Sequence, residues 1–329
     1  MATIKDVAKR AGVSVATVSR VLNNKGPLSE TAIVKVNEAV KDLHYTPNLL
    51  ARSLASGKKS LIGVVLPSFN TPIWSETAQM IASCAREIGY NVVFYYMPFN
   101  SDNRFEAVEY LRDRQVSGVI FCGSMWKDQL LKEKLRHLKN LPLVVVIDKV
   151  EGVPCIVSDD GGGGSAAARL LISKGCKHLA HVSSDLSIYK HSDERTIAFL
   201  RECEKAGVSC RRYENDNAIP VLEDTAALMD RILQEEPLTD GLFVKNDMLA
   251  AQCVSYAIRH DIKIPDRIRI IGYDDMRFSH VMYPSMTTLR HDYRRLAQTA
   301  IQSILDQVEG KSVEPFTVIP VELIERETT

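Results

Sequence analysis

Residues 15 to 22 form a short segment whose side chains are suited to binding DNA. Val18, Val21 and Leu22 face inward, because residues three and four apart share one side of a helix. The other side presents small, hydroxyl and basic groups, at Val15, Ala16, Thr17, Ser19 and Arg20. Guanidinium and hydroxyl groups donate hydrogen bonds to bases and phosphates, so this face fits the major groove of DNA.

A preceding helix and a tight turn must hold this segment in place. Val7 and Ala8 predict the inner face of a first helix, and Gly12 permits the turn that follows. Val13 fills the corner between the helices, and Ser14 caps the second by accepting a hydrogen bond from a free N–H group. This layout predicts a helix-turn-helix. The alternative is a pair of amphipathic surface helices in a larger domain.

A third helix and a short following segment complete the predicted head. The third helix runs from a cap at Ser29 to Leu43. After it, Pro47 suits the first turn of another helix and Gly57 suits its end. A helix of this length is marginal by itself in water, so we expect it to be ordered only when it packs against a partner.

The charge of the chain is unevenly distributed, although its 41 basic and 41 acidic residues cancel. The first sixty residues hold seven Lys and three Arg against two Asp and two Glu, a net charge of +6, which leaves −6 on the remainder. A basic head on an acidic body indicates a polyanionic partner confined to one end.

The 329 residues are enough for a small module followed by one large or two medium domains. The seven cysteines are scattered and form no C-x-x-C pair, so we expect buried thiols in a reducing compartment, without disulfides or a metal site. No signal peptide opens the sequence, and no apolar run is long enough to cross a membrane. We therefore expect a soluble, cytoplasmic protein without a cofactor.

Beyond residue 60, apolar strands alternate with helices. Continuous apolar runs predict doubly buried parallel strands at 61–66, 91–96, 118–121 and 143–147, with helices near 75–88, 103–115 and 127–139. A second set has strands near 178–183, 241–244 and 268–272, and helices near 164–174, 194–206, 223–235 and 247–260. The two sets predict two doubly wound α/β subdomains with a cleft between them.

Four consecutive glycines, Gly161 to Gly164, follow Asp159 and Asp160 at the boundary between the two sets. The run lacks the Lys-Ser/Thr of a phosphate-binding P-loop and the spacing of a dinucleotide fingerprint. We interpret it as a flexible hinge and the start of a helix.

The chain resembles the LacI/GalR family of bacterial transcriptional regulators over essentially its full length. The resemblance rests on Ile4-Lys5-Asp6-Val7-Ala8, Gly12-Val13-Ser14, Thr17-Val18-Ser19-Arg20-Val21-Leu22-Asn23, Tyr45-x-Pro47-Asn48-x-x-Ala51-Arg52-x-Leu54, Ile271-Gly272-Tyr273-Asp274-Asp275 and Leu323-Ile324-x-Arg326. Two departures are Ala32-Ile33, where the family usually has Thr-Arg, and Ala198, where a glycine is usual.

The resemblance implies an α/β fold class with an N-terminal three-helix helix-turn-helix head, a hinge helix, and a periplasmic-binding-protein-like core of two doubly wound parallel-sheet subdomains. The core subdomains would be discontinuous. The expected parts are a head at 1–46, a hinge helix and linker at 47–60, a core N-subdomain at 61–160 plus 291–318, and a core C-subdomain at 161–290 plus 319–329.

For DNA, the resemblance puts the base-reading positions on Val15, Ala16 and Arg20. Valine and alanine can contact thymine methyls, and arginine can donate two hydrogen bonds to guanine. Leu54 matches the family's wedge between base pairs, the alternative being an apolar linker residue that packs on the core. The other operator contacts are expected from Thr3, Lys5, Ser14, Thr17, Ser19, Asn23, Tyr45, Asn48 and Ala51.

For a small-molecule effector, the resemblance implies cleft residues at Ile73, Trp74, Ser124, Asp148, Arg195, Asn246, Asp274 and Tyr293. An aromatic ring can stack on a sugar or a nucleobase, while carboxylates accept sugar hydroxyls and arginine donates to them. The alternatives are a core position for Trp74 and surface or helix-capping roles for the acids.

These observations predict a homodimeric, sequence-specific repressor whose affinity for a palindromic operator in double-stranded DNA is controlled by a small carbohydrate in the cleft. The alternative effectors are a purine, a sugar phosphate or a partner protein. A transport-type binding protein is disfavoured by the DNA head and the missing signal peptide. An enzyme that hydrolyses glycosides is disfavoured because no nucleophile is paired with a base.

Overall fold

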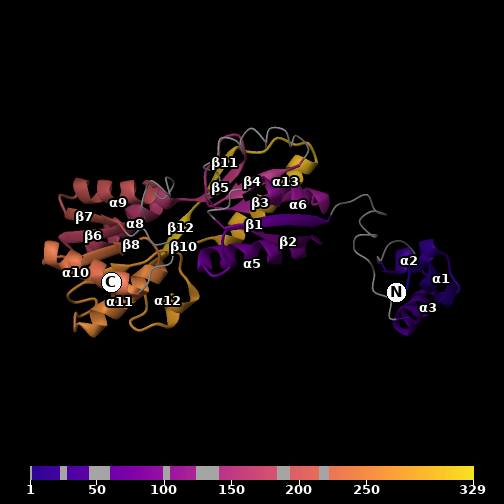
Figure 1. The fold of residues 1–329 in the computed structure, drawn as a ribbon, viewed down its shortest axis with the longest axis horizontal. Helices are drawn as coiled ribbons and strands as arrows, with labels where there is room; N and C mark the ends of the chain where they lie inside the picture. Colours follow the sequence, from indigo (N-terminus) through magenta and orange to yellow (C-terminus); the bar gives the residue numbers. More distant parts are fainter. Residues whose placement is uncertain are drawn as a thin grey trace. The chain divides into compact units, whose positions relative to one another are not determined.

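The computed structural model describes residues 2–22, 28–43, 60–98, 104–123, 141–183, 193–214 and 222–329. The chain forms two compact units, Met1–Lys59 and Ser60–Thr329. Figure 1 colours both units along the sequence. The predicted helices at 47–57 and 127–139 lie outside the described residues.

The first unit contains three helices around a small apolar core. They are α1 (Ile4–Ala11), α2 (Val15–Leu22) and α3 (Glu30–Asp42). Gly12 ends α1 with a φ of 64°, a left-handed conformation that glycine adopts at little cost. The core is formed by Val7, Ala8, Ala11, Val18, Val21, Val36 and Ala39. The predicted helix-turn-helix and its third helix are therefore confirmed.

The second unit consists of two lobes, each built on a parallel sheet. The sheet of the first lobe has the order β11-β5-β4-β3-β1-β2. Its strands are β1 (Leu61–Leu66), β2 (Asn91–Tyr96), β3 (Gly118–Cys122), β4 (Leu143–Val146), β5 (Cys155–Ser158) and β11 (Phe316–Ile319). Helices α5 (Pro72–Glu87) and α13 (Tyr293–Val308) cover one face, and α6 (Arg104–Asp113) covers the other.

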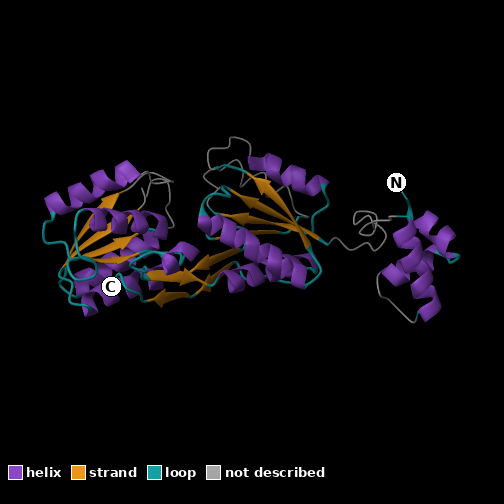
Figure 2. Ribbon diagram, turned by 90° about the horizontal axis from the view of Figure 1, so that it is seen from below, coloured by secondary structure: helices purple, strands orange, loops and turns teal. Residues whose placement is uncertain are grey.

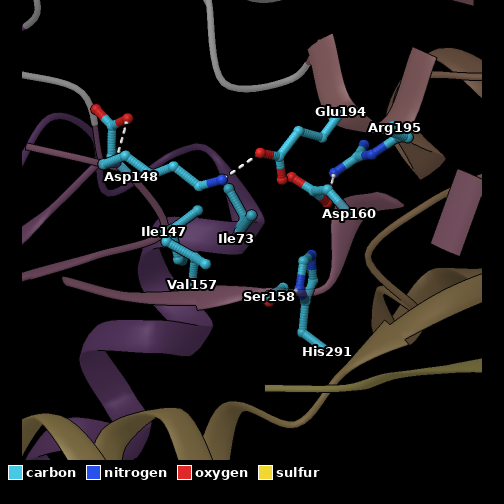
Figure 3. Close-up of a pocket in the computed structure, with 10 residues that line it drawn as sticks. Ile73, Ile147, Asp148, Val157, Ser158, Asp160, Glu194, Arg195 and His291 are labelled. Carbon is cyan, nitrogen blue, oxygen red and sulfur yellow. Dashed lines mark hydrogen bonds and ion pairs between the residues drawn. The ribbon is translucent and has the colours of Figure 1, made fainter. Parts of the chain in front are cut away.

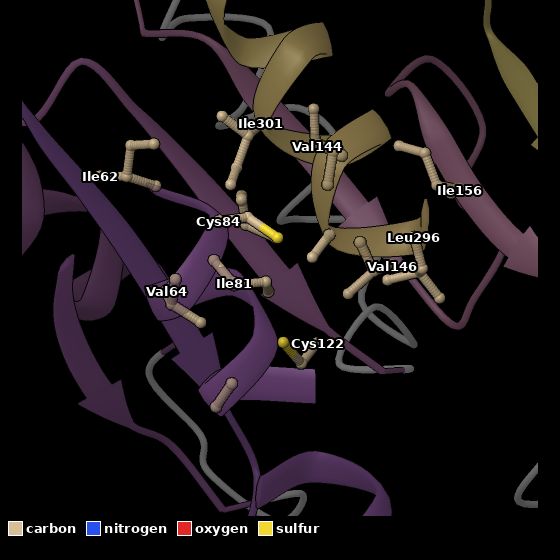
Figure 4. Close-up of a cluster of buried hydrophobic side chains, with 14 of the residues drawn as sticks. Ile62, Val64, Ile81, Cys84, Cys122, Val144, Val146, Ile156, Leu296 and Ile301 are labelled. Carbon is tan, nitrogen blue, oxygen red and sulfur yellow. The ribbon is translucent and has the colours of Figure 1, made fainter. Parts of the chain in front are cut away.

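The core of the first lobe explains why its central strands read as continuous apolar runs. Alternate residues of one strand, such as Val64 and Val65, pack into clusters on opposite faces of the sheet. Figure 4 shows the cluster beneath α5 and α13, where Ile81 and Leu296 meet the strand residues. These strands are therefore held by packing on both sides.

The second lobe repeats this plan with the strand order β7-β6-β8-β9. Its strands are β6 (His178–Ser183), β7 (Ser209–Glu214), β8 (Gly241–Val244) and β9 (Arg269–Ile271). Helices α8 (Asp160–Ser173) and α9 (Asp193–Lys205) cover one face, and α10 (Leu222–Glu235) and α11 (Asp247–Arg259) the other. Figure 2 shows the strands of each lobe between their helices. The predicted α/β architecture is confirmed.

The chain passes between the lobes three times. It leaves the first lobe after β5, returns where β10 (Thr288–His291) leads into α13, and leaves again between β11 and β12 (Val321–Ile324). Strands β10 and β12 pair antiparallel, with His291 opposite Val321. A short helix, α12 (Arg277–Val281), precedes this ribbon. The three crossings therefore run close together.

The glycine run corrects one part of the sequence interpretation. Gly161 to Gly164 do start a helix, but they lie inside α8 and do not form a flexible hinge. A Cβ on Gly164 would lie 2.1 Å from the carbonyl oxygen of Arg195 in α9. The glycines therefore allow α8 and α9 to pack closely together.

Candidate functional sites

The start of α2 is fixed by its own side chains. The hydroxyl of Ser14 accepts a hydrogen bond from the Thr17 N–H at 3.0 Å, and the two hydroxyl oxygens lie 2.8 Å apart. The predicted Ser14 cap is therefore confirmed. This capping holds the first turn of α2, so the side chains that follow are displayed from a rigid element.

The outward face of α2 carries the predicted base-reading residues. Val15 is 41% exposed, and Ala16 and Arg20 are also exposed. Thr17 and Ser19 are half-buried on the flanks of this face. The combination of small apolar groups and one guanidinium can contact thymine methyls and the edge of a guanine.

Thr3 and Lys5 lie at the start of α1, Thr3 as its N-cap residue. Thr3 closes a capping box, since its N–H donates to the Asp6 carboxylate at 2.8 Å and its hydroxyl to the same oxygen at 2.7 Å. These hydrogen bonds favour ionised Asp6 and lower its pKa. Lys5 is exposed. The remaining DNA-contact candidates, Asn23, Tyr45, Asn48, Ala51 and Leu54, lie outside the described residues.

A small cavity lies between the two lobes of the second unit. Its volume is about 30 Å³, enough for about two water molecules. The first lobe contributes side chains from the start of α5, from the residues after β4 and from the end of β5, and the second contributes the starts of α8 and α9 and the end of β10 (Figure 3). Carboxyl ends of parallel strands and the adjoining helix starts are where α/β folds bind ligands. The lining residues are Ile73, Ile147, Asp148, Lys149, Val157, Ser158, Asp160, Glu194, Arg195 and His291.

Arg195 is the centre of a buried polar cluster on the second-lobe side of the cavity. Its guanidinium donates to the Asp160 carboxylate at 2.7 Å and to the Lys245 carbonyl at 2.6 Å. It also stacks on the Tyr273 ring, 3.2 Å from the ring centroid, and the Tyr273 hydroxyl donates to Asp160 at 2.8 Å. The Nε of Arg195 is buried and has no hydrogen-bond partner among the described residues.

Electrostatics keep this cluster ionised. Burial disfavours the Asp160 carboxylate, but the charges of Arg195 and His291 and the hydrogen bonds from Arg195 and Tyr273 together outweigh it, so the pKa of Asp160 lies below its ordinary value. Burial likewise opposes the Arg195 charge, yet Asp160, Tyr273 and Asp274 together raise the pKa of Arg195 above its usual range. Burial, followed by the Asp160 charge, raises the pKa of Tyr273 well above its ordinary value, so its hydroxyl remains a donor.

His291 connects the two lobes at the second crossing. The Ser158 hydroxyl oxygen, at the end of β5, lies 2.6 Å from its Nδ1, and an Asp274 carboxylate oxygen lies 3.1 Å from its Nε2. Asp274 has a φ of 109°, a strained conformation of the kind found at functional sites. The Tyr293 hydroxyl donates to the Asp274 carbonyl at 3.4 Å.

The first-lobe wall carries a second set of charges. Asp148 is 2% exposed and accepts a hydrogen bond from the Lys149 N–H at 2.7 Å. The Lys149 ammonium forms an ion pair with Glu194 from the second lobe. Both lining cations, Lys149 and Arg195, are therefore paired with carboxylates.

The structure brings together part of the predicted effector set. Ile73, Asp148 and Arg195 line the cavity, and Asp274 and Tyr293 lie behind His291. Trp74 packs in the first-lobe core, in agreement with the alternative expected for it. Asn246 caps α11 by accepting from the Leu249 N–H at 2.9 Å. Ser124 lies outside the described residues.

Five polar cavity residues were not predicted from the sequence. They are Lys149, Ser158, Asp160, Glu194 and His291. Asp160 and Lys149 stand shortly after apolar runs, where strands end, so the position of a strand end could have indicated them. No local pattern indicates His291, because its partner Ser158 is 133 residues away in the sequence.

No group of three or more His, Cys, Asp or Glu is placed to hold a metal ion in the part of the chain that the structure describes. Within that same part, every helix is too short or too polar to span a bilayer.

Comparisons with known proteins cover both units of the chain. A family profile described as bacterial regulatory proteins, lacI family, matches residues 3–48, and a periplasmic binding protein-like domain matches residues 168–329. The ribose operon repressor of Halalkalibacterium halodurans is 31% identical over 331 residues, which cover 100% of this chain and 97% of that relative.

Solved structures resemble the whole chain or its core. A lac repressor dimer bound to operator and the anti-inducer ONPF is 27% identical, with a TM-score of 0.83 over 99% of this chain and 98% of that chain. A periplasmic binding protein/LacI transcriptional regulator from Alkaliphilus metalliredigens QYMF, complexed with D-xylulofuranose, is 25% identical. Its TM-score is 0.70 over 82% of this chain and 99% of its own.

Proposed function

The chain belongs to the lacI family of bacterial regulatory proteins and is a DNA-binding transcriptional repressor, and we propose that a small neutral carbohydrate in the cavity between its lobes controls its affinity for DNA. As a regulator it is not an enzyme. It acts in the cytoplasm as a homodimer on a palindromic operator, an assembly supported by the similarity to the lac repressor dimer bound to its operator.

The pairing of charges in the cavity is the observation that supports a neutral effector. Lys149 and Arg195 are each bound to a carboxylate, and Asp148 adds a third negative charge to the lining. An anionic ligand would meet several carboxylates in this lining, and it could gain a cation only by displacing a carboxylate that already binds it. A sugar hydroxyl can instead donate to a carboxylate and accept from a cation without leaving a charge unpaired.

The proposed DNA contacts combine base readout with positioning. Val15, Ala16 and Arg20 read bases, whereas Lys5, Thr17 and Ser19 bind phosphates. The head comprises residues 1–46, the hinge helix and linker 47–60, and the two core subdomains have the boundaries expected from the sequence. The same proposal assigns Leu54 the role of an apolar wedge.

Leu54→Ala tests the wedge. We expect this variant to lose affinity for operator while binding to unrelated duplex DNA is retained, because unstacking requires the apolar side chain only where the DNA bends. Fluorescence anisotropy on both duplexes measures the two affinities. An equal loss on both would contradict the wedge.

A thermal-shift screen tests the effector class. Purified protein is compared with and without free sugars, sugar phosphates and purines. A ligand at about one hundred times its dissociation constant stabilises the folded state by roughly 2.7 kcal/mol. We expect stabilisation by a free sugar and a change in operator affinity with that sugar. Stabilisation only by phosphates or purines would overturn the neutral-carbohydrate proposal, and no stabilisation by any of them would favour a partner protein.

A further inference from the structure

One ion pair between residues that line the cavity joins the two lobes directly. Lys149 follows the end of β4 in the first lobe, and Glu194 lies in the first turn of α9 in the second lobe. Figure 3 shows Glu194 on the second-lobe side of the cavity, opposite Asp148 and Ile147 of the first lobe. The side chains are 30% and 52% exposed, so solvent reaches the pair from outside.

The space that the ion pair closes is too small for a sugar. The cavity has a volume of about 30 Å³, whereas pockets for small molecules typically measure about 300–1,000 Å³. A ligand therefore cannot enter while Lys149 and Glu194 remain bound and the lobes keep this spacing. Either the pair separates or the site stays closed.

A second ion pair between the lobes lies outside the cavity lining. Arg277 of α12 and Glu76 of α5 lie 3.1 Å apart, but neither residue lines the cavity. This pair can join the lobes without occupying the path of a ligand. Lys149 and Glu194 combine both roles, because they connect the lobes and line the site.

We propose that Lys149 and Glu194 form an internal latch that competes with the effector. In the closed arrangement the ammonium and the carboxylate satisfy each other. When a sugar enters, the pair separates and each ion is hydrated from the solvent side, which both side chains already reach. The latch thus favours the ligand-free arrangement, and by linkage the effector favours the open one. This inference rests on the proposed sugar-binding function of the same cavity.

Glu194→Gln tests the latch, and Glu325→Gln is a matched control. Glu325 pairs with Lys174 inside the second lobe, and these side chains are 32% exposed for Lys174 and 50% for Glu325, close to those of the latch. Both substitutions remove one carboxylate charge from an ion pair with a lysine. Only the pair of Glu194 with Lys149 lines the cavity and joins the two lobes. Lys149→Gln removes the opposite partner and is the second variant.

The first measurement is hydrogen–deuterium exchange of the full-length, ligand-free protein. We expect Glu194→Gln and Lys149→Gln to speed exchange at residues 147–153 and 193–200 by about two- to fivefold, the factor expected from losing a partly exposed ion pair. Glu325→Gln should leave both segments unchanged. Equal exchange in all proteins would overturn the latch, whatever the cavity binds.

The second measurement is isothermal titration with D-ribose as the probe sugar. We expect Glu194→Gln to bind D-ribose about two- to fivefold more tightly than the unsubstituted protein, because the internal competitor is weakened. Weaker binding by Glu194→Gln would overturn the latch, since Glu194 would then hold the sugar without opposing it. If D-ribose binds to none of the proteins, the choice of sugar fails while the exchange measurement still decides the latch.

Discussion

Arg20 is the basic side chain on the outward face of α2, where its neighbours Val15 and Ala16 are small. Such a face would allow the helix to approach the bases closely. In the proposed complex the guanidinium donates two hydrogen bonds to O6 and N7 of a guanine. Sequence preference should therefore depend strongly on this one residue, whereas the other cations of the head contribute mainly to attraction for phosphates.

Arg20→Ala is expected to lower operator affinity by about 1–3 kcal/mol, because a bidentate contact to guanine is lost. Affinity for unrelated DNA should change little. Lys5→Ala is the comparison. It should weaken binding to both duplexes alike and reduce the salt dependence of the affinity by about one phosphate contact. Anisotropy titrations at several salt concentrations separate the two patterns, and a uniform loss for Arg20→Ala would contradict base reading.

His181 shows how burial determines the charge of a residue in the second lobe. It is fully buried between Phe199 and Phe243, with ring centroids 5.3 and 4.9 Å away. Its Nδ1 lies 3.0 Å from the Phe243 carbonyl and its Nε2 lies 2.9 Å from the Thr196 hydroxyl. The neutral ring donates from Nδ1 and accepts at Nε2. Burial lowers the pKa of His181 to about 3.

The stability of the protein should therefore fall in acid through His181. The unfolded chain binds a proton below its ordinary pKa of 6.5, while the folded ring stays neutral down to about pH 3, so unfolding takes up a proton between these values. Each pH unit in this window costs about 1.4 kcal/mol of stability. Urea unfolding at pH 7, 6 and 5 should show a shallower decline for His181→Gln, and parallel declines would contradict this role.

At the scale of elements, the contact between α8 and α9 depends on the glycine run. Gly164 lies against the backbone of Arg195, and Gly163 against Tyr273, where an added Cβ would lie 2.6 Å from the hydroxyl oxygen. Because Arg195 and Tyr273 bind Asp160 beside the cavity, the spacing of the two helices positions the polar cluster. A change in this spacing should therefore affect ligand binding as well as stability.

Gly164→Ala should destabilise the protein by about 1–3 kcal/mol, because the added methyl meets backbone and forces the helices apart. Gly161→Ala is the control in the same helix, since its Cβ would have its nearest neighbour 3.8 Å away. This second change should stabilise α8 by about 0.5–1 kcal/mol through a lower backbone entropy. Thermal unfolding measures both, and equal effects would contradict the close packing.

The elements that could be predicted from the sequence were those with a hydrophobic pattern among neighbouring residues. The inner face of α2 and strand β1 follow from helical spacing and an apolar run, and both are confirmed. Strand β11 was not predicted, because at the sheet edge it alternates exposed and buried residues over only four positions. The contact of Ser158 with His291 was not predicted either, since the two residues are 133 positions apart and only the fold brings them together. Trp74 fits an apolar core and a ligand cleft equally well on sequence grounds.

At the scale of the whole molecule, a sensor and a DNA-reading head share one chain, so binding to one can be linked to binding to the other. A sugar can change operator affinity only if it binds one arrangement of the protein more tightly than the other. The linkage is reciprocal, and allosteric factors of this kind are typically about 5–150.

We expect operator DNA to change the sugar affinity by the same factor by which the sugar changes operator affinity. Isothermal titration of the sugar, with and without saturating operator, gives the first factor, and anisotropy with and without sugar gives the second. Agreement supports a two-state regulator. A sugar that binds but leaves operator affinity unchanged would contradict control through the cavity.

The three crossings between the lobes also determine the order in which the parts of the protein become complete during synthesis. The first lobe is incomplete until α13 and β11 are made, and the second lacks β12 until almost the last residue. The head needs only the first few dozen residues, and early segments fold first as a chain leaves the ribosome. A nascent chain therefore has a finished head long before it has a working sensor. A chain that ends before residue 293 would carry the DNA-reading part with both lobes still incomplete.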